Sequence, residues 1–316
     1  MPYNLPDYLM DSGLFRFERL ILEDIDNGPV LSLNDPAMAQ EEICLFHREV
    51  SEGNEYMALL DAAVVKGLAE HRALPVVRFA DGEYAFYGGS LECNGLYRQA
   101  ESRATIKTSL PDHVRALKRL ARIGILAPLI FPGNTAAAPR QSWLRLPWTK
   151  KKTSASTFLE FLQEHGIRLT KQNYVPFYVV YAYLTSQDFA RRVDGQKVCI
   201  VNSEYNASGC RAWFERFDSH PEIVFALLPA TYVATQWEVI REDLLPRIPA
   251  DTAVCLVGAG VGALPVCVDV AEGLSIPALD AGHVLNLMND RVDKSNGARL
   301  YTQRAGGRSE SEKSDV

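Results

Sequence analysis

The sequence predicts an α/β protein with a mostly parallel sheet flanked by helices. Short apolar runs typical of buried strands alternate with segments whose apolar spacing suits helices. The expected strands are continuous apolar runs, which is typical of strands that are covered on both faces. In such sheets ligands bind beyond the carboxyl ends of the strands. The residues that directly follow each strand are therefore the first candidates for a functional site.

The composition is that of an ordinary globular protein. The chain has 316 residues, of which 47% are hydrophobic and 23% charged, so a substantial core can be buried. Its net charge of −6 is opposite to the basic balance of a general nucleic-acid binder. The six cysteines lack the spacing of a zinc site or a disulfide framework. No signal peptide or bilayer-spanning apolar run is seen, so we expect a soluble cytoplasmic protein.

The chain is expected to divide into three parts. Residues 1–35 carry turn signals and are expected to form an extension that packs on the core. Residues 36–301 are expected to form a single domain. From residue 302 onward the sequence is polar and charged, so residues 302–316 are expected to be a disordered tail.

Apolar spacing places the elements within this domain. Strands are expected at Leu74–Val77, Ile125–Phe131, Lys197–Val201, Ile223–Leu228, Thr252–Val257 and Pro277–Leu279. Helices are expected at Ile43–Val50, Met57–Leu68, Thr105–Arg122, Thr157–His165, Phe177–Arg192, Ala207–Phe217, Trp237–Leu245 and Ala263–Glu272. Between the second strand and the fourth helix, Pro132–Lys152 is longer than most loops, and loops of this size tend to be functional or disordered.

The stretch Arg78-Phe79-Ala80-Asp81-Gly82-Glu83 directly follows the first expected strand. In extended backbone Asp81 and Glu83 point to the same side, so they can converge on one hard cation, and Gly82 allows a close approach. Mg²⁺ or Mn²⁺ prefers oxygen ligands and keeps positions for water and substrate phosphates. The structural alternative is a solvated turn that opens a helix, with the acids near its positive end.

Three further stretches follow other expected strands: Asn202-Ser203-Glu204, Gly258-Ala259-Gly260-Val261-Gly262 and Asp280-Ala281-Gly282-His283. The glycine loop lets a phosphate or ribose approach the backbone at a helix start, and Asp280 lies where a ribose-binding acid sits in a dinucleotide fingerprint. An NAD- or S-adenosylmethionine-dependent enzyme is therefore an alternative function. Structurally, the glycines could simply permit close packing of the helix on the strand.

Two other features carry a functional and a structural interpretation. His283 stands beside a strand-end acid and a glycine, although a single histidine is more often structural. The loop from Arg140 to Lys152 combines several cations with Trp143 and Trp148. It suits a sugar acceptor, a phosphate or an anionic membrane surface, and peripheral membrane contact is predicted through Trp143–Lys152. The alternative is a solvated basic loop with its tryptophans on the core.

Two of these stretches resemble one known family. Arg78-Phe79-Ala80-Asp81-Gly82-Glu83 resembles the Arg-(Phe/Tyr)-Gly-Asp-Gly-Glu signature of the GT-D-type bacterial glycosyltransferases. The segment from Val257 through Asp269 to Asp280-Ala281-Gly282-His283 resembles that family's closing segment, and the similarity spans roughly Val76–Leu287. Ala80 departs from the signature, which usually has glycine there.

The resemblance implies a Rossmann-like GT-D-type fold that transfers a sugar from a nucleotide diphosphate sugar, generally UDP-linked, with Mn²⁺ or Mg²⁺. It implies that Asp81 and Glu83 serve metal and donor, with Arg78 as a fixed cation. With the strand-end stretches, the predicted donor site is Arg78, Asp81, Gly82, Ser203, Gly258, Gly260 and Asp280. The catalytic base is left open among Glu83, Glu204 and His283.

The resemblance also implies a partner and a place in the cell. Such enzymes build surface polysaccharide or glycans on proteins, so the acceptor would be a glycan or glycoconjugate. The protein would then work in the cytoplasm near the inner face of the membrane. A catalytically inactive relative that still binds a sugar nucleotide is a further alternative.

Overall fold

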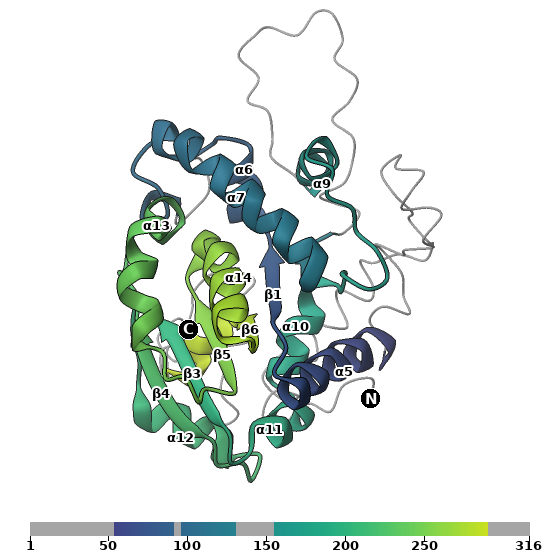
Figure 1. Cartoon of the computed structure of the whole chain (residues 1–316), viewed down its shortest axis with the longest axis vertical. Coiled ribbons are helices and arrows are strands. Elements are labelled where there is room, and N and C mark those ends of the chain that lie inside the picture. The colour runs from purple at the N-terminus through teal and green to yellow at the C-terminus, as the bar shows by residue number, and fades with distance from the viewer. Residues whose placement is uncertain (1–53, 92–95, 131–154, 290–316) are drawn as a thin grey trace, which may run out of the picture.

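The computed structural model describes residues 54–91, 96–130 and 155–289, and they form a six-stranded sheet between two layers of helices (Figure 1). The sheet order is β2-β1-β6-β5-β3-β4, and every neighbouring pair is parallel. The strands are β1 (Leu74–Phe79), β2 (Ile125–Pro128), β3 (Lys197–Asn202), β4 (Glu222–Leu227), β5 (Val254–Gly258) and β6 (Pro277–Asp280). This arrangement confirms the predicted α/β class and mostly parallel sheet.

Helices cover both faces of the sheet because its strands are apolar on both sides. One face packs against α7 (Arg103–Ile123), α13 (Val233–Leu244) and α14 (Ala263–Leu274), and α7 crosses in front of β1 in Figure 1. The other face packs against α5 (Asn54–Glu70), α10 (Phe177–Leu184), α11 (Gln187–Val193), α12 (Ala207–Glu215) and α15 (His283–Met288). The remaining elements are α6 (Asp81–Tyr87), α9 (Ala155–Glu164), η1 (Leu96–Arg98), η2 (Leu245–Arg247) and η3 (Gly260–Gly262).

The helix α14 is largely buried, because it packs on β1, β5, β6 and α7. All its residues from Ala263 to Ala271 are buried, including the carboxylate of Asp269. That carboxylate accepts a hydrogen bond from the indole N–H of Trp237 at 2.6 Å and pairs with Arg119 at 2.7 Å. A buried charge is tolerated only when such partners compensate its lost hydration.

The predicted single helix from Phe177 to Arg192 is wrong. The chain forms two helices there, α10 and α11, which are separated at Thr185 and Ser186. The Ser186 side chain caps the second helix by accepting a hydrogen bond from the backbone N–H of Phe189 at 3.1 Å. Serine competes for backbone hydrogen bonds in this way, and the continuous apolar spacing hides the break.

Several predictions fall outside the described residues. These are the 1–35 extension, the helix Ile43–Val50, the Trp143–Lys152 loop and the 302–316 tail. Of the helices that the structure does describe, none has both the length and the hydropathy required to cross a bilayer.

The strand order creates a switch point beside the sheet centre. The connection that leaves β3 leads outward to the edge strand β4, whereas the connection that leaves the neighbouring β5 leads back to β6. Asn202 and Gly258 end these two strands and are paired in register. Ligands of open α/β sheets bind where such connections diverge, so the topology marks this edge before any side chain is considered.

Gly124 ends α7 directly beside β1, and it provides a test of the packing. A Cβ atom at Gly124 would lie 2.2 Å from the backbone oxygen of Pro75. Gly124→Ala should therefore lower the free energy of unfolding by about 1–3 kcal/mol, measured by urea denaturation. Gly273→Ala is the matched control: a Cβ atom at this exposed helical position has no neighbour within 4 Å. It should be neutral or stabilising by up to ~1 kcal/mol, and equal losses in the two variants would contradict the packing.

Candidate functional site

A cavity of about 380 Å³ lies at the carboxyl ends of β1, β3, β5 and β6. It brings together most of the predicted site residues: Arg78, Gly82, Glu83, Gly258, Gly260, Asp280 and His283. Its other walls are formed by Ala80, Leu96, Gln99, Phe177, Tyr181, Asn202, Val261, Gly282 and Asn286. The predicted residues Asp81, Ser203 and Glu204 are not part of its lining.

The wall of this cavity contains a buried ion pair between Arg78 and Asp280. The Nη2 atom of Arg78 lies 2.7 Å from Oδ1 of Asp280, and both side chains are only 7% exposed. The Nε–H of Arg78 donates to the backbone oxygen of Asp280 at 3.0 Å, and its backbone N–H donates to Oδ2 at 3.2 Å. The pair therefore connects the end of β1 directly to the end of β6.

Aromatic rings complete the surroundings of Arg78. Its guanidinium carbon lies 4.0 Å from the ring centre of Tyr181 and 5.0 Å from that of Phe177, so both rings make cation–π contacts. Burial alone would lower the pKa of Arg78, but the charge of Asp280 raises it above its ordinary value. The guanidinium is permanently charged, and its charge is balanced inside the protein.

Gly282 is required by the same guanidinium. The backbone of Gly282 has φ +39°, and a Cβ atom there would lie 2.0 Å from Nη2 of Arg78. Only glycine allows both this backbone conformation and this approach. The closing motif Asp280-Ala281-Gly282-His283 is thus explained in part by its fit to Arg78.

The predicted extended backbone from Asp81 to Glu83 is wrong, because α6 begins at Asp81. Residues i and i+2 of a helix are about 200° apart around its axis, so the two carboxylates do not share a side. Glu83 lines the cavity, and its Oε2 accepts a hydrogen bond from the backbone N–H of Ala80 at 2.8 Å. Asp81 is exposed at the helix start. The local structure is the helix opening that the sequence offered as the alternative.

The environment of Glu83 changes its ionisation. Burial in the cavity wall raises its pKa from 4.5 to about 7, although the hydrogen bond from Ala80 opposes the shift. Burial disfavours a charged carboxylate because the cavity cannot replace its hydration. Glu83 can therefore exchange a proton near neutral pH.

The carboxylates fit only one way of holding a divalent cation. Among the described residues no three or more His, Cys, Asp or Glu side chains are grouped as a metal cage. Both oxygens of Asp280 are engaged by Arg78, which leaves Glu83 as the cavity carboxylate without a cationic partner in the described ranges. Mg²⁺ is commonly bound through one or two carboxylates plus substrate phosphates. These residues fit a cation shared with a phosphate ligand.

The glycine loop after β5 serves packing and lines the cavity at the same time. Gly260 has φ +54°, and a Cβ atom there would lie 2.7 Å from Nε2 of Gln99. A Cβ atom at Gly262 would lie 2.7 Å from Cγ1 of Val233 on α13. Gly258 and Gly260 also line the cavity. Close packing thus explains why glycines stand here, and two of them still face the ligand space.

Two neighbouring strand ends contribute further polar groups. Asn202, rather than the predicted Ser203, lines the cavity, and its Nδ2 donates to the backbone oxygen of Glu204 at 3.0 Å. His283 begins α15 and also lines the cavity, with its Nδ1 3.3 Å from Nδ2 of Asn286. Both groups stand where a ligand in the cavity can reach them.

Sequence reasoning missed several cavity residues. Asn202 belongs to the predicted strand-end stretch Asn202-Ser203-Glu204, but Ser203 was selected from it in place of Asn202, which ends β3. Tyr181 and Phe177 stand on a helix that carries no motif, and Gln99 lies in an irregular segment. In the part of the chain that the structure describes, the buried Oε1 of Gln99 has no hydrogen-bond partner. That oxygen can accept a hydrogen bond from a bound hydroxyl or N–H group.

Comparison with known proteins identifies the type of domain. Residues 139–288 match the GT-D fold-like domain family, a range that includes the closing motif but not Arg78–Glu83. Similar solved structures include a glycosyltransferase (DUF1792) from Streptococcus sanguinis, with 16% identity over 72% of this chain and 81% of that chain and a TM-score of 0.43. Another is a domain of unknown function 1792 described as having a distinct glycosyltransferase fold, with 15% identity over 73% and 83% and a TM-score of 0.42. The chain matches none of the curated proteins with which it was compared.

The ion pair predicts a large loss of stability when one partner is neutralised. Asp280→Asn keeps the side-chain size but leaves the buried charge of Arg78 without its counter-charge, which costs about 3–5 kcal/mol. Urea denaturation at neutral pH measures this loss. Asp251→Asn is the control, because Asp251 pairs with Lys197 at 2.6 Å but is exposed, and it should change stability little. Equal small effects of both substitutions would show that the buried pair is not a constraint.

The raised pKa of Glu83 predicts a pH-dependent difference between the wild type and Glu83→Gln. The protonated carboxyl suits the folded state, so its stabilising contribution is complete below about pH 4.5 and is lost as the pH rises through about 7. In the presence of a chelator, the wild type should become less stable than Glu83→Gln across that window. Denaturant titrations at several pH values measure the difference. A parallel pH profile for Glu83→Gln and wild type would refute the shift.

Proposed function

We propose that the protein, whose residues 139–288 match the GT-D fold-like domain family, moves a sugar from a nucleotide diphosphate sugar to a glycan or glycoconjugate acceptor. The observation that supports this most directly is the shared cavity at the carboxyl edge of the sheet. There Arg78 and Glu83 of the first motif meet Asp280 and His283 of the closing motif. The two motifs are far apart in the sequence but form one site.

The charge balance of the cavity favours dependence on a divalent cation. A diphosphate ligand is strongly anionic, yet the guanidinium of Arg78 is already neutralised by Asp280. Glu83 adds negative charge when it is ionised. Among the described residues that line the cavity, Arg78 is the only lysine or arginine, so these side chains provide no uncompensated positive charge. A bound Mn²⁺ or Mg²⁺ ion would supply it, stabilising the charge that develops on the leaving diphosphate.

The residues of the cavity can be assigned to parts of such a donor. Glu83 would hold the cation together with the phosphates. Asp81 lies two residues before Glu83, at the start of the same helix. The backbone at Gly258 and Gly260 faces the cavity where a phosphate or ribose could approach. We take the donor to be UDP-linked, in line with the resemblance of the two motifs.

Transfer requires a general base that removes the proton from the acceptor hydroxyl. Glu83 and His283 both line the cavity and are candidates for this role. Glu204 does not line the cavity, so its side chain is the weaker candidate. A glycan acceptor in surface polysaccharide or glycoprotein biosynthesis would place the enzyme in the cytoplasm at the inner face of the membrane. The Trp143–Lys152 loop, proposed for peripheral membrane contact, lies outside the described residues.

The alternative of an NAD- or S-adenosylmethionine-dependent enzyme finds less support in the geometry. Asp280, the acid that would bind a ribose hydroxyl, has both carboxylate oxygens engaged by Arg78. The Gly258–Gly262 turn packs against Gln99 and Val233, so its glycines have a structural reason to be there. A catalytically inactive relative is distinguished by activity: it would bind a sugar nucleotide without transferring or hydrolysing it.

Calorimetric titration with UDP and UDP-sugars, with and without Mn²⁺, tests the proposal. Wild-type protein should bind in a Mn²⁺-dependent manner. Glu83→Ala should weaken binding by roughly 10–100-fold, which corresponds to the loss of one interaction with a charged group. Asp81→Ala tests whether the exposed carboxylate at the start of the same helix takes part. Asp251→Ala is the control and should bind like wild type. Asp251 is exposed and lies just before β5, at the edge of the sheet opposite to the cavity. Undiminished binding by Glu83→Ala would exclude the proposed role of the motif.

A further inference from the structure

The surface helix α7 has a charge balance opposite to that of the whole chain. Its sequence from Arg103 to Ile123 contains six cations and one acid, Asp112. The complete chain has a net charge of −6. Positive charge is thus concentrated on one helix of a protein that is otherwise acidic.

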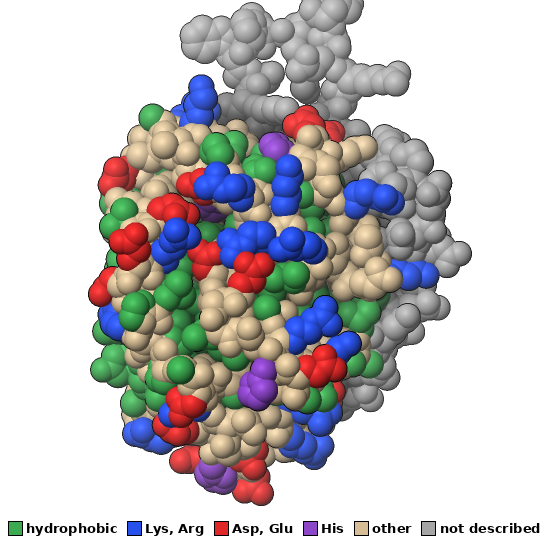
Figure 2. Space-filling view, in the orientation of Figure 1, with side chains coloured by type: hydrophobic (Ala, Val, Ile, Leu, Met, Phe, Trp, Pro, Cys, Tyr) green, Lys and Arg blue, Asp and Glu red, His purple; other side chains and the backbone are tan. Residues whose placement is uncertain are grey.

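The exposed cations of α7 form a single stripe. They are Arg103, Lys107, Arg115, Lys118 and Arg122. At 100° per residue these five positions fall within an arc of about 120°, and at 1.5 Å per residue they extend over about 28 Å. Asp112 lies outside this arc. Figure 2 shows Lys and Arg side chains gathered over the part of this face that α7 crosses in Figure 1.

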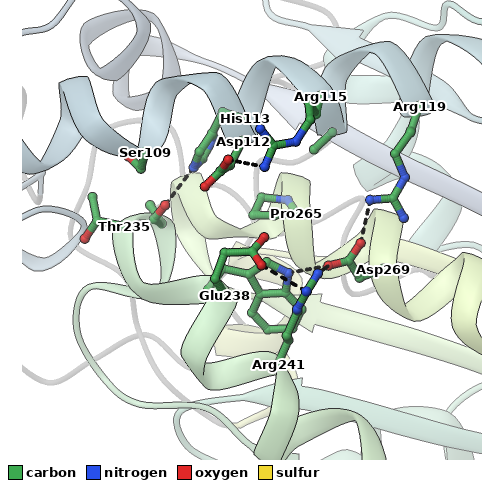
Figure 3. A pocket seen from close by; sticks show the side chains of 13 residues that line it. Ser109, Asp112, His113, Arg115, Arg119, Thr235, Glu238, Arg241, Pro265 and Asp269 are labelled. Atoms are coloured by element: carbon green, nitrogen blue, oxygen red, sulfur yellow. Dashed lines mark hydrogen bonds and ion pairs between the residues drawn. The ribbon is translucent and has the colours of Figure 1, made fainter.

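On the inner flank of α7, basic side chains are paired with acidic ones. A cavity of about 180 Å³ lies there between α7, α13 and α14, and Figure 3 shows its charged residues joined in pairs. Arg119 pairs with Asp269 at 2.7 Å, and Arg241 pairs with Glu238 at 3.0 Å. These cations are occupied by neighbouring acids, so this flank offers no surplus charge to an external partner.

The outer stripe keeps its charge. Within the described ranges Lys107 and Lys118 form no ion pair, and Arg122 approaches Glu272 only at 3.7 Å. Arg115 pairs with Asp112 but remains 66% exposed. The stripe therefore presents two lysines without an ion pair, together with three arginines that have a local partner but remain exposed.

We propose that the outer stripe of α7 docks on the anionic phospholipid headgroups of a membrane surface. A surface that carries many phosphates can contact cations along the length of the helix, and each Lys or Arg adds to the attraction. The stripe has no aromatic side chain on which nucleic-acid bases could stack.

Docking through α7 would also bring the candidate site close to the membrane. The Nε–H of Arg103 donates to the backbone oxygen of Gly89 at 2.8 Å, so the start of α7 is tied to the loop after α6. Gln99, which lines the cavity, lies four residues before Arg103. The inference itself does not depend on the proposed function, because it rests on the charges of α7 alone.

Cosedimentation with vesicles tests the proposal on the full chain. Wild-type protein should bind vesicles of phosphatidylglycerol mixed with phosphatidylcholine at low salt and should be released by high salt. Lys107→Gln/Lys118→Gln/Arg122→Gln should reduce the partition coefficient by roughly a hundredfold, or roughly fivefold for each cation removed. The three side chains are exposed, so thermal melting should be unchanged and separates lost binding from unfolding.

A matched variant removes the same charge from the opposite face of the sheet. Lys66→Gln/Arg191→Gln/Arg211→Gln changes exposed or half-buried cations on α5, α11 and α12 and should bind like wild type. A third variant, Lys150→Gln/Lys151→Gln/Lys152→Gln, should retain the α7-dependent part of binding. The proposal is overturned if the α7 variant binds like wild type, or if wild-type protein ignores anionic vesicles. Retention on a soluble polyanion without binding to vesicles would overturn it as well.

Discussion

The buried ion pair between Arg78 and Asp280 is the constraint on which the rest of the site depends. It joins β1 to β6, which are neighbours in the sheet but come from opposite ends of the described chain. Removing both charges from water is costly, and the cost is offset by several hydrogen bonds and by the rings of Phe177 and Tyr181. The same pair explains why position 282 is a glycine, since no larger residue fits beside the guanidinium.

This pair also determines what the cavity can offer to a ligand. Because Arg78 and Asp280 neutralise each other, the net charge of the cavity varies with the protonation of Glu83. The carboxyl of Glu83 is held near its point of titration by burial, with a pKa of about 7. A cation that binds there would favour the ionised carboxylate, so metal binding and proton release from Glu83 should be linked. The first motif thus contributes Arg78, whose charge is permanent, and Glu83, whose charge changes with its protonation.

The fold was predictable from sequence to a large extent, whereas the site was predictable only in part. Each strand of a parallel sheet is a continuous apolar run, so β3 and β5 are visible without any knowledge of their partners. The expectation that ligands bind beyond the carboxyl ends of the strands then identified Gly258 and His283. It could not find the pairing of Arg78 with Asp280, because these residues are 202 positions apart and nothing local indicates that β1 and β6 are neighbours.

Ala80 shows how the departure from the family signature acts on the site. Its backbone angles of φ −136° and ψ −162° are extended, a conformation open to any residue, so alanine causes no backbone strain here. Its N–H still donates to Glu83, and this hydrogen bond does not require a glycine. The methyl group does, however, line the cavity, where glycine would leave open space. We therefore expect alanine at this position to affect the shape of the cavity beside Glu83 rather than the folding of the chain.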